Sequence, residues 1–288
     1  LWLNNLKDKK IFIFEHNVIN ELPKEIKGIN YIIHAASIAS PIFYRKNPIE
    51  TMDANVIGLR NLLDYSINNN LLRSFLYFSS SEVYGDPNKN NIPTDEGYWG
   101  NVSFTGPRAC YDESKRYGET LCVNFYQQHG VPIKITRPFN NYGPGLKIDD
   151  KRVIPDFANN IINDKNIVLH SDGTPTRTFC YIADAIIGYI KVLINGKNSE
   201  AYNIGIEKPE ISIKHLAKKM IEIASKNFNY KGELEFKNNN DINYLTDNPN
   251  RRCPSISKAR KDIGFNPNIS LDEGLYRCLS WYYNIENI

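Results

Sequence analysis

Tyr111 and Lys115 have the types and the spacing that proton chemistry requires. Because they are four residues apart, their side chains share one face of a helix. A tyrosine hydroxyl ordinarily holds its proton until about pH 10, and a nearby ammonium stabilises the phenolate and lowers that pKa. A tyrosine tuned toward neutrality can accept the proton of a sugar hydroxyl while hydride leaves the same carbon. Taken alone, this spacing is common and favours a surface tyrosine beside a solvated lysine.

Two further polar segments lie on either side of this pair, each at the end of an apolar run. The first comprises Ser79, Ser80, Ser81 and Glu82, and the second runs from Arg137 to Asn140. Hydroxyls at the carboxyl end of a strand face the crevice where ligands bind in open α/β sheets. One of these serines can therefore hydrogen-bond a reacting hydroxyl beside the tyrosine. The alternative is a polar turn, which explains the composition but not the Val83-Tyr84-Gly85 that follows.

Hydrophobic periodicity predicts the elements that bring these residues together. In the first half of the chain, apolar runs predict strands at residues 10–14, 31–34, 75–78 and 132–136, and helical spacing predicts helices at about 48–68 and 107–128. Strands that alternate with helices imply parallel strands joined by crossover helices. The predicted fold class is therefore α/β, with helices on both faces of one sheet.

The second half of the chain alternates less regularly. Its predicted helices lie at about 154–163, 182–194, 212–224 and 271–283, and its predicted extended segments at 167–170, 177–181 and 234–236. We expect a smaller α/β lobe over the carboxyl ends of the strands. The expected division is a Rossmann-like domain at residues 1–145, to which a segment at about 177–205 returns, and a mainly substrate-binding lobe at residues 146–288.

Composition is that of an ordinary globular protein. Hydrophobic residues make up 41% and charged residues 23% of the chain, and the formal net charge is +3. The basic residues form no block that predicts nucleic-acid binding, and no apolar run has the length of a membrane span. The five cysteines show no Cys-x-x-Cys spacing and the histidines show no metal spacing. We therefore expect reduced thiols in a cytoplasmic protein without a metal site.

Four motifs together resemble one protein family. They are His34-Ala35-Ala36-Ser37, Ser80-Ser81-Glu82-Val83-Tyr84-Gly85, Tyr111-x-x-x-Lys115 and Arg137-Pro138-Phe139-Asn140-Asn141-Tyr142-Gly143-Pro144. The set is similar to that of the extended short-chain dehydrogenase/reductases, the NAD-dependent epimerase/dehydratase family. The resemblance implies a Rossmann-like, doubly wound parallel sheet, NAD as cofactor and a UDP-sugar as substrate. It also implies a homodimer formed through the helices at about 48–68 and 107–128.

Within that family the chain is most similar to the UDP-glucuronate decarboxylases. The similarity lies in residues 36–51, 81–87, 107–116 and 247–256. Sugar 4,6-dehydratases carry an Asp-Glu pair where this chain has Ser81-Glu82, because the Asp protonates a departing hydroxyl, and 4-epimerases usually lack the Glu. A decarboxylase needs no leaving hydroxyl, so Ser81-Glu82 fits it better. The alternatives that stay open are a 4-epimerase, a 4,6-dehydratase and an inactive Rossmann-like binding scaffold.

The resemblance also implies a mechanism and its residues. Tyr111 deprotonates the C4 hydroxyl while hydride passes to NAD, and the 4-ketone then makes the C6 carboxylate a β-keto acid that loses carbon dioxide. Catalytic roles fall on Tyr111, Lys115, Ser80, Ser81, Glu82 and Arg252. Cofactor contacts fall on Asn17, Val18, Ala35, Ala36, Ser37, Asn55, Ser79, Tyr111, Lys115 and Pro138. Substrate contacts fall on Ser81, Glu82, Asn140, Lys147, Arg152, Arg177 and Arg252. Without the resemblance, Arg252 is as easily a solvated residue of a polar loop.

The chain contains no Gly-x-x-Gly-x-x-Gly, the turn whose backbone approaches a dinucleotide pyrophosphate at a helix N-terminus. By resemblance, Leu1 falls just after the second strand of the family fold, and Asn17-Val18 stands where Asp-Val is usual near adenine. We therefore expect a truncated chain that by itself binds NAD poorly and is nearly inactive, whereas the full natural protein is active. Tight NAD binding by residues 1–288 in calorimetry would refute this expectation.

Overall fold

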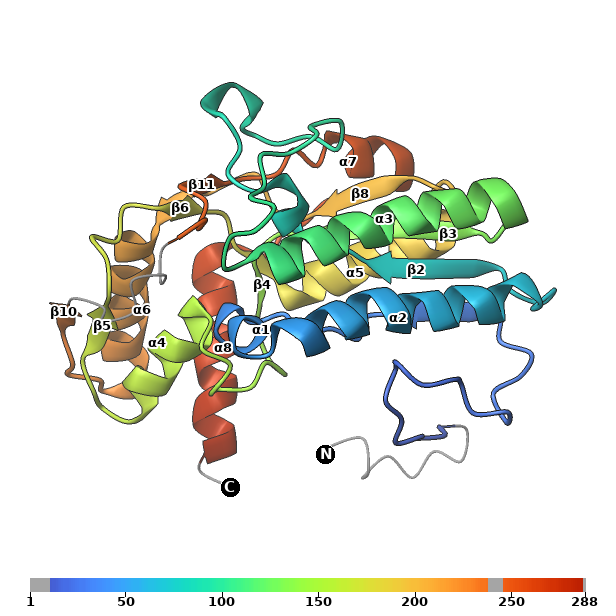
Figure 1. Cartoon of the computed structure of the whole chain (residues 1–288). Helices are drawn as coiled ribbons and strands as arrows, with labels where there is room; N and C mark the ends of the chain where they lie inside the picture. The colour runs from blue at the N-terminus through green and yellow to red at the C-terminus, as the bar shows by residue number, and fades with distance from the viewer. Residues whose placement is uncertain (1–10, 238–245, 287–288) are drawn as a thin grey trace.

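A sheet of four parallel strands forms the centre of the molecule in the computed structural model, which describes residues 11–237 and 246–286. The strands are β1 (Tyr31–His34), β2 (Ser74–Phe78), β3 (Ile133–Pro138) and β8 (Ala201–Ile204). Their order is β1-β2-β3-β8 (Figure 1). β2 and β3 are buried along most of their length, as parallel strands covered on both faces should be. The strands predicted at 31–34, 75–78 and 132–136 are confirmed.

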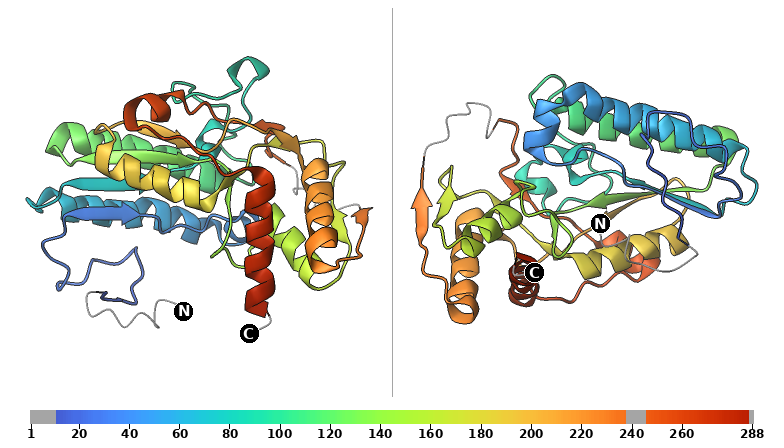
Figure 2. Two further views of the ribbon diagram at one scale, coloured as in Figure 1. Left: turned by 180° about the vertical axis from the view of Figure 1, so that it is seen from behind. Right: turned by 90° about the horizontal axis from the view of Figure 1, so that it is seen from below.

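Helices cover both faces of this sheet (Figure 2, right). One face carries α2 (Pro48–Ile67) and α3 (Ala109–His129), and the other carries α5 (Ile182–Asn195) and α7 (Ser257–Ile263). The layer of α2 and α3 packs on Phe75 and Tyr77 of β2, whereas the layer of α5 and α7 packs on Leu76. Successive side chains of β2 thus point to opposite layers, which is the period of two expected of a strand. The helices predicted at about 48–68, 107–128 and 182–194 are confirmed.

Close contacts hold α2 and α3 to each other and to the sheet. Asn55 on α2 is fully buried and donates to Ser114 Oγ on α3 at 2.8 Å. On α3, a Cβ added to Gly118 would lie 2.1 Å from the hydroxyl of Tyr77. The missing side chain therefore lets α3 approach β2 this closely. The helix ends at Gly130, whose φ of 69° is the left-handed conformation that glycine favours after a helix.

A second lobe lies at the carboxyl ends of the strands (Figure 1). It contains α4 (Val153–Ile162), α6 (Ile213–Phe228), α8 (Leu271–Glu286) and the parallel pair β5 (Ile167–Leu169) and β10 (Leu234–Phe236). Its own core includes Ile154, Leu216 and Leu275, all nearly or fully buried. The helices and extended segments predicted at 154–163, 167–170, 212–224, 234–236 and 271–283 are confirmed. In the described part of the chain, no helix is both long enough and apolar enough to cross a bilayer.

Several elements are too short for the sequence to predict in full. They are α1 (Pro41–Lys46), the 3₁₀ helices η2 (Ser81–Tyr84) and η3 (Lys89–Asn91), and the two-residue strands β4 (Asn141–Tyr142), β6 (Thr176–Arg177), β7 (Cys180–Tyr181), β9 (Ile211–Ser212) and β11 (Arg251–Arg252). The extended segment predicted at 177–181 is split between β6 and β7, which belong to different small sheets. The pairing of β6 with β11 sets Arg177 directly beside Arg252.

The strand predicted at residues 10–14 is wrong over the part that the structure describes. Residues 11–14 form no strand, and Lys10 lies outside the described residues. Phe12 is 79% exposed. Within residues 11–237 and 246–286, no strand pairs with the outer side of β1. The backbone groups of a strand need hydrogen-bond partners on a neighbouring strand, so an apolar run forms a strand here only if such a neighbour is present.

Candidate active site

Tyr111 lies at the start of α3 with its ring buried, only 6% exposed. The Ser80 hydroxyl, at the end of β2, hydrogen-bonds to the Tyr111 hydroxyl. On its other side the ring stacks on Tyr44 of α1, with ring centroids 5.0 Å apart and an interplanar angle of 11°. The hydrogen bond and the stack together fix the direction in which the phenol points.

Burial controls the protonation of both members of the Tyr111–Lys115 pair. It raises the pKa of Tyr111 to about 12, although the hydrogen bond from Ser80 acts in the opposite direction. Burial also lowers the pKa of Lys115 to about 7. The Lys115 nitrogen donates to the carbonyl oxygen of Phe78 at 2.9 Å and lies 5.6 Å from the Tyr111 ring centroid. In the protein alone, desolvation of the phenolate keeps the pKa of Tyr111 above its ordinary value. The lowering of that pKa by Lys115 stays a prediction.

The residues after β2 form η2 and carry two groups of the site, the Ser80 hydroxyl and the Glu82 carboxylate. Ser80 is the N-cap of η2 and accepts a hydrogen bond from the Glu82 backbone N–H at 3.2 Å. Ser81 opens η2 and is buried. Because one serine caps the turn, the carboxylate of Glu82 and the hydroxyl that reaches Tyr111 come from a single rigid segment.

Ser79 takes part in a buried network at the end of β2, and its predicted contact with the cofactor stays a prediction. Its hydroxyl donates to the Glu119 carboxylate. Glu119 also forms an ion pair with Arg137 at 2.6 Å, and Arg137 donates to the Tyr84 hydroxyl at 2.6 Å. This network ties the ends of β2 and β3 to α3, which fixes the segment that carries Ser80 and Glu82.

Glu82 is held between two buried guanidiniums. Arg252 on β11 binds both carboxylate oxygens, with Nη1 on Oε1 and Nη2 2.6 Å from Oε2. Arg108, at the N-cap of α3, places its Nη2 2.7 Å from the same Oε2. Each of these arginines is only 7% exposed. Burial by itself would raise the pKa of Glu82, but the two guanidiniums outweigh it and hold that pKa below its ordinary value.

Charged groups of both signs surround Glu82. Burial and the charge of Glu82 raise the pKa of Asp112 well above its ordinary value. Burial and the neighbouring Arg252 lower the pKa of Arg177 to about 9, which still leaves this guanidinium charged at neutral pH. The guanidiniums of Arg108, Arg177 and Arg252 thus gather around the Glu82 carboxylate, and the carboxylates of Asp86 and Asp247 also act on this cluster.

The other predicted substrate residues lie in different environments. Asn140 has a positive φ of 42° and donates to the Thr178 carbonyl oxygen at 3.1 Å. The charge of Arg152 acts on Tyr111, whose pKa it lowers slightly against the larger effect of burial. Lys147 is exposed. The structure thus brings Arg152 toward Tyr111, while the side chain of Asn140 is occupied in a backbone contact.

Arg177 uses its guanidinium to hold a loop. It donates to the carbonyl oxygen of Pro249 at 2.6 Å and to that of Thr176 at 2.8 Å. These bonds fix the chain just before β11, and so they help to position Arg252. The contact between Arg177 and a nucleotide that the sequence predicted stays a prediction.

The predicted cofactor residues that follow β1 and end β3 lie at the carboxyl edge of the sheet. Ala35, Ala36 and Ser37 follow β1, and Pro138 ends β3. Ser37 Oγ and Asn55 Oδ1 are buried, and neither has a hydrogen-bond partner within the described ranges. These orphaned oxygens, together with the Lys115 ammonium, fit the hydroxyl and amide groups of the nicotinamide riboside half of NAD.

The adenosine half of NAD has less support in the part of the chain that the structure describes. Asn17 is exposed, and its side chain accepts a hydrogen bond from the Ile19 backbone at 3.3 Å. Val18 packs against Gly58 of α2. Residues 11–237 and 246–286 contain no glycine-rich turn for the pyrophosphate. The expectation of weak NAD binding by this chain stays a prediction.

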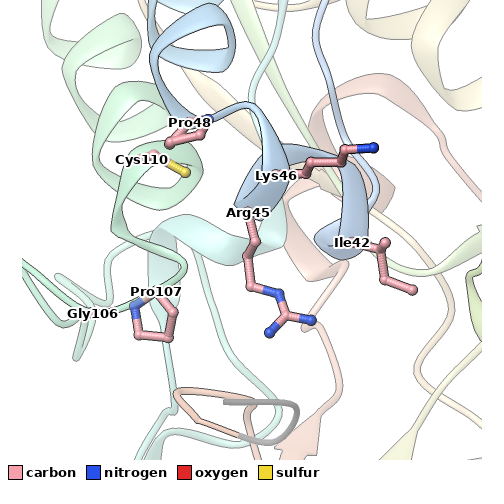
Figure 3. Close-up of a pocket in the computed structure, with 7 residues that line it drawn as sticks. All are labelled: Ile42, Arg45, Lys46, Pro48, Gly106, Pro107 and Cys110. Carbon is pink, nitrogen blue, oxygen red and sulfur yellow. The ribbon is translucent and has the colours of Figure 1, made fainter. Parts of the chain in front are cut away.

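A cavity of about 540 Å³ adjoins the cluster between α1 and the start of α3 (Figure 3). Its lining consists of Ile42, Arg45, Lys46, Pro48, Gly106, Pro107 and Cys110. The Arg45 side chain extends toward the turn at Gly106 and Pro107, whereas Lys46 points away from it (Figure 3). The same two segments carry Tyr44 and Arg108, so the cavity borders the wall of the site.

Sequence reasoning did not assign Tyr44, Arg108 and Asp112 to the site. Arg108 and Asp112 flank Tyr111 at the start of the helix, three residues before it and one after. Charged residues so close to a candidate catalytic tyrosine were the available signal for both. Tyr44 had none, because its stacking on Tyr111 depends on α1, which the sequence did not predict.

Comparisons with known proteins agree with this architecture. The family model described as the NAD dependent epimerase/dehydratase family matches residues 7–205. UDP-glucuronic acid decarboxylase 3 of Arabidopsis thaliana is 38% identical over 263 residues, which cover 91% of this chain and 72% of that protein. A UDP-glucose 4-epimerase structure with UDP-glucose from Thermotoga maritima has a TM-score of 0.79 at 23% identity, covering 89% of this chain and 78% of that one. A mutant UDP-glucuronic acid 4-epimerase from Bacillus cereus, solved with NAD, has a TM-score of 0.73 at 26% identity, covering 90% and 77%.

Proposed function

Because the chain belongs to the NAD-dependent epimerase/dehydratase family, we propose that it oxidises UDP-glucuronate at C4 and removes C6 as carbon dioxide. The product is UDP-xylose or the UDP-4-keto-pentose. The observation that carries this proposal is the two-point contact of the buried Arg252 with the Glu82 carboxylate, beside a second guanidinium from Arg108. A guanidinium that already holds a carboxylate in this geometry suits the carboxylate of a glucuronate, whereas a neutral hexose offers it no such group.

Tyr111 is the proposed proton acceptor for the C4 hydroxyl, and Ser80 holds that hydroxyl in line with the phenol. NAD, when bound, supplies the hydride acceptor for C4 and a positively charged ring that favours the phenolate. Lys115 and the orphaned Ser37 and Asn55 oxygens would hold the nicotinamide riboside. The stack of Tyr44 on Tyr111 keeps the phenol in one orientation during the transfer.

Loss of carbon dioxide follows from the ketone at C4. The bond between C5 and C6 breaks, and its electron pair passes into the C4 carbonyl as an enolate, to which the protonated Tyr111 donates a hydrogen bond. A proton then adds at C5 and gives the UDP-4-keto-pentose. Return of the hydride to C4, with the proton of Tyr111 passing back to the oxygen, gives UDP-xylose. Arg252 orients the departing carboxylate through two parallel N–H donors, which match the geometry of that group. Because the side chain at position 81 is a serine, no acid stands there to expel a hydroxyl as a dehydratase requires.

The product distribution tests this proposal. The natural protein is incubated with NAD and UDP-glucuronate, and the nucleotide sugars are separated and identified by mass spectrometry. The expected result is a UDP-pentose with carbon dioxide in equal amounts. Conversion only to UDP-galacturonate would instead establish a 4-epimerase, and binding without turnover would establish a scaffold.

We also propose that two copies pair through α2 and α3. Ile49 and Met52 on α2 and Tyr117 on α3 are exposed by 63%, 42% and 50%. Large apolar side chains gathered on adjacent helices are typical of an interface between subunits. The symmetric pairing of two copies would cover them with the same helices of the partner.

A further inference from the structure

Glu82 loses hydrogen bonds if Arg252 binds a substrate carboxylate. In the structure Arg252 donates both of its terminal nitrogens to Glu82, one to each oxygen. A guanidinium that holds a second carboxylate in the same two-point geometry must release the first. Glu82 would then lose its two bonds to Arg252. The inference below rests on the proposed function, because it needs a sugar that carries a carboxylate.

A buried carboxylate that loses its partner does not stay ionised. The Glu82 side chain is 14% exposed, so water replaces few of the lost bonds. Removing one partner of a buried ion pair leaves an uncompensated charge, and the carboxyl takes up a proton instead. Glu82 would therefore change its charge on substrate binding if Arg252 were its only cationic partner.

Arg108 is a second partner whose position does not depend on Arg252. Its Nη2 lies 2.7 Å from Oε2 of Glu82. It comes from the N-cap of α3, whereas Arg252 comes from the two-residue strand β11. The guanidinium of Arg108 also lies over the ring of Tyr44, 5.8 Å from its centroid. The helix and the ring hold Arg108 in place while Arg252 turns.

Buried polar atoms around Glu82 are available to bind an additional ligand. The Tyr44 hydroxyl, Arg108 Nε and Asp112 Oδ1 are buried, and none has a hydrogen-bond partner within residues 11–237 and 246–286. Tyr44 is only 1% exposed. Buried polar atoms are ordinarily paired, so three orphans around one carboxylate indicate that a polar group completes the site.

We propose that Arg108 is a positioning residue that keeps Glu82 ionised while Arg252 exchanges the Glu82 carboxylate for the carboxylate of the sugar. Two charged groups act on the Glu82 carboxylate, namely Arg108 at the N-cap of α3 and Arg252 of β11. The charge of Glu82 acts in turn on Tyr111 and Asp112 of α3, Arg177 of β6 and Tyr44 of α1. With Arg108 present, the substrate complex forms without uptake of a proton by Glu82. Without Arg108, Glu82 becomes protonated as Arg252 leaves it.

Proton uptake on binding tests this proposal by calorimetry in buffers of different ionisation enthalpy. The protein carries Tyr111→Phe so that bound sugar is not consumed, and NAD is present at saturation. We expect the parent protein to bind UDP-glucuronate without proton uptake. Addition of Arg108→Met should give uptake of up to about one proton per site, and further addition of Glu82→Gln should abolish it. UDP-glucose, which lacks the carboxylate, should give no uptake with any variant.

The outcomes separate the two proposals. If the parent protein does not prefer UDP-glucuronate to UDP-glucose, the proposed function fails. If it has that preference but Arg108→Met binds without proton uptake, or if the uptake survives Glu82→Gln, the role of Arg108 is overturned. Should Arg108→Met fail to fold, infrared difference spectra of the parent protein decide the question. A protonated-carboxyl band that appears on binding UDP-glucuronate and that Glu82→Gln removes would also overturn the proposal.

Discussion

At Tyr111 the structure sets two effects against each other. Burial raises the pKa of the phenol to about 12, and the hydrogen bond from Ser80 lowers it by less. A group with so high a pKa remains protonated in the free protein at neutral pH, which suits a residue that must return its proton later in a reaction. The phenolate forms only when further positive charge arrives or when the proton leaves together with the hydride.

Tyr111→Phe should abolish turnover and leave sugar binding intact. The substitution removes only the hydroxyl that accepts the C4 proton, so we expect the rate of carbon dioxide release to fall by about 10²- to 10⁴-fold. Tyr276→Phe is the matched control, since Tyr276 lies on α8, outside the proposed pairing of α2 and α3, and is 43% exposed. The assignment of Tyr111 fails if its variant keeps more than a small fraction of the control's rate.

Lys115 should make stability depend on pH. Its pKa is about 7 in the folded protein because of burial, below the ordinary value of 10.5. Between these two values the unfolded chain binds the proton that the folded chain lacks, so stability rises with pH across this window. Relative to Lys115→Met, the natural protein should gain about 1.4 kcal/mol per pH unit above neutrality, measured by urea unfolding. Lys218→Met, at an exposed lysine of α6, should show no such slope, and a flat difference for Lys115 would exclude the low pKa.

Residue types predicted part of the site. Tyr111, Lys115, Ser80, Glu82 and Arg252 were assigned from motifs, and the structure brings Ser80 to Tyr111 and Arg252 to Glu82. The protonation of Tyr111 was not predictable, because the balance between burial and charge depends on the folded surroundings. Arg108 lies three residues before Tyr111, but its contact with Glu82 was not predictable, because only the fold brings these two segments together.

Among the secondary-structure elements, hydrophobic periodicity predicted the long helices and the buried strands. α2, α3 and the buried runs β2 and β3 repeat apolar residues over enough positions to reveal their type. The two-residue strand β11 is defined by its pairing with β6, and no pattern in two residues can reveal such a pairing. The failed strand at residues 11–14 is the converse case, an apolar run without a neighbouring strand among the described elements.

The packing of α3 on β2 makes Gly118 sensitive to substitution. Gly118→Ala would place a Cβ 2.1 Å from the hydroxyl of Tyr77, a residue that is fully buried. We expect a loss of about 1–3 kcal/mol in the free energy of unfolding, despite the better helix propensity of alanine. Asn124→Ala, at an exposed position of α3, is the control and should be neutral or slightly stabilising. Equal stabilities in denaturant would show that α3 can move away from β2 without cost.

At the scale of the whole molecule, the sheet and the second lobe share one site. The sheet supplies Ser80, Glu82 and Tyr111 through β2 and α3, and the chain around the lobe supplies Arg177 and Arg252. The ion pair between Glu82 and Arg252 joins positions 170 residues apart in sequence. The site therefore exists only when both parts are folded against each other.

Pairing of two copies through α2 and α3 is testable with one charge. Met52→Asp puts a carboxylate on the exposed face of α2, so we expect it to convert a dimer into a monomer in light scattering coupled to size-exclusion chromatography. Ile187→Asp is the control, because Ile187 is 52% exposed on α5 at the opposite face of the sheet. A monomeric natural protein, or dimer loss only with Ile187→Asp, would contradict the proposed interface.

The fate of C6 shows whether the site around Glu82 receives a carboxylate and whether Tyr111 starts its removal. The natural protein, NAD and UDP-glucuronate labelled with ¹³C at C6 are followed by ¹³C NMR. We expect the label to leave the sugar and to appear as carbon dioxide and bicarbonate, and we expect Tyr111→Phe to prevent this. Label that stays at C6 of a nucleotide sugar while C4 inverts would contradict this expectation.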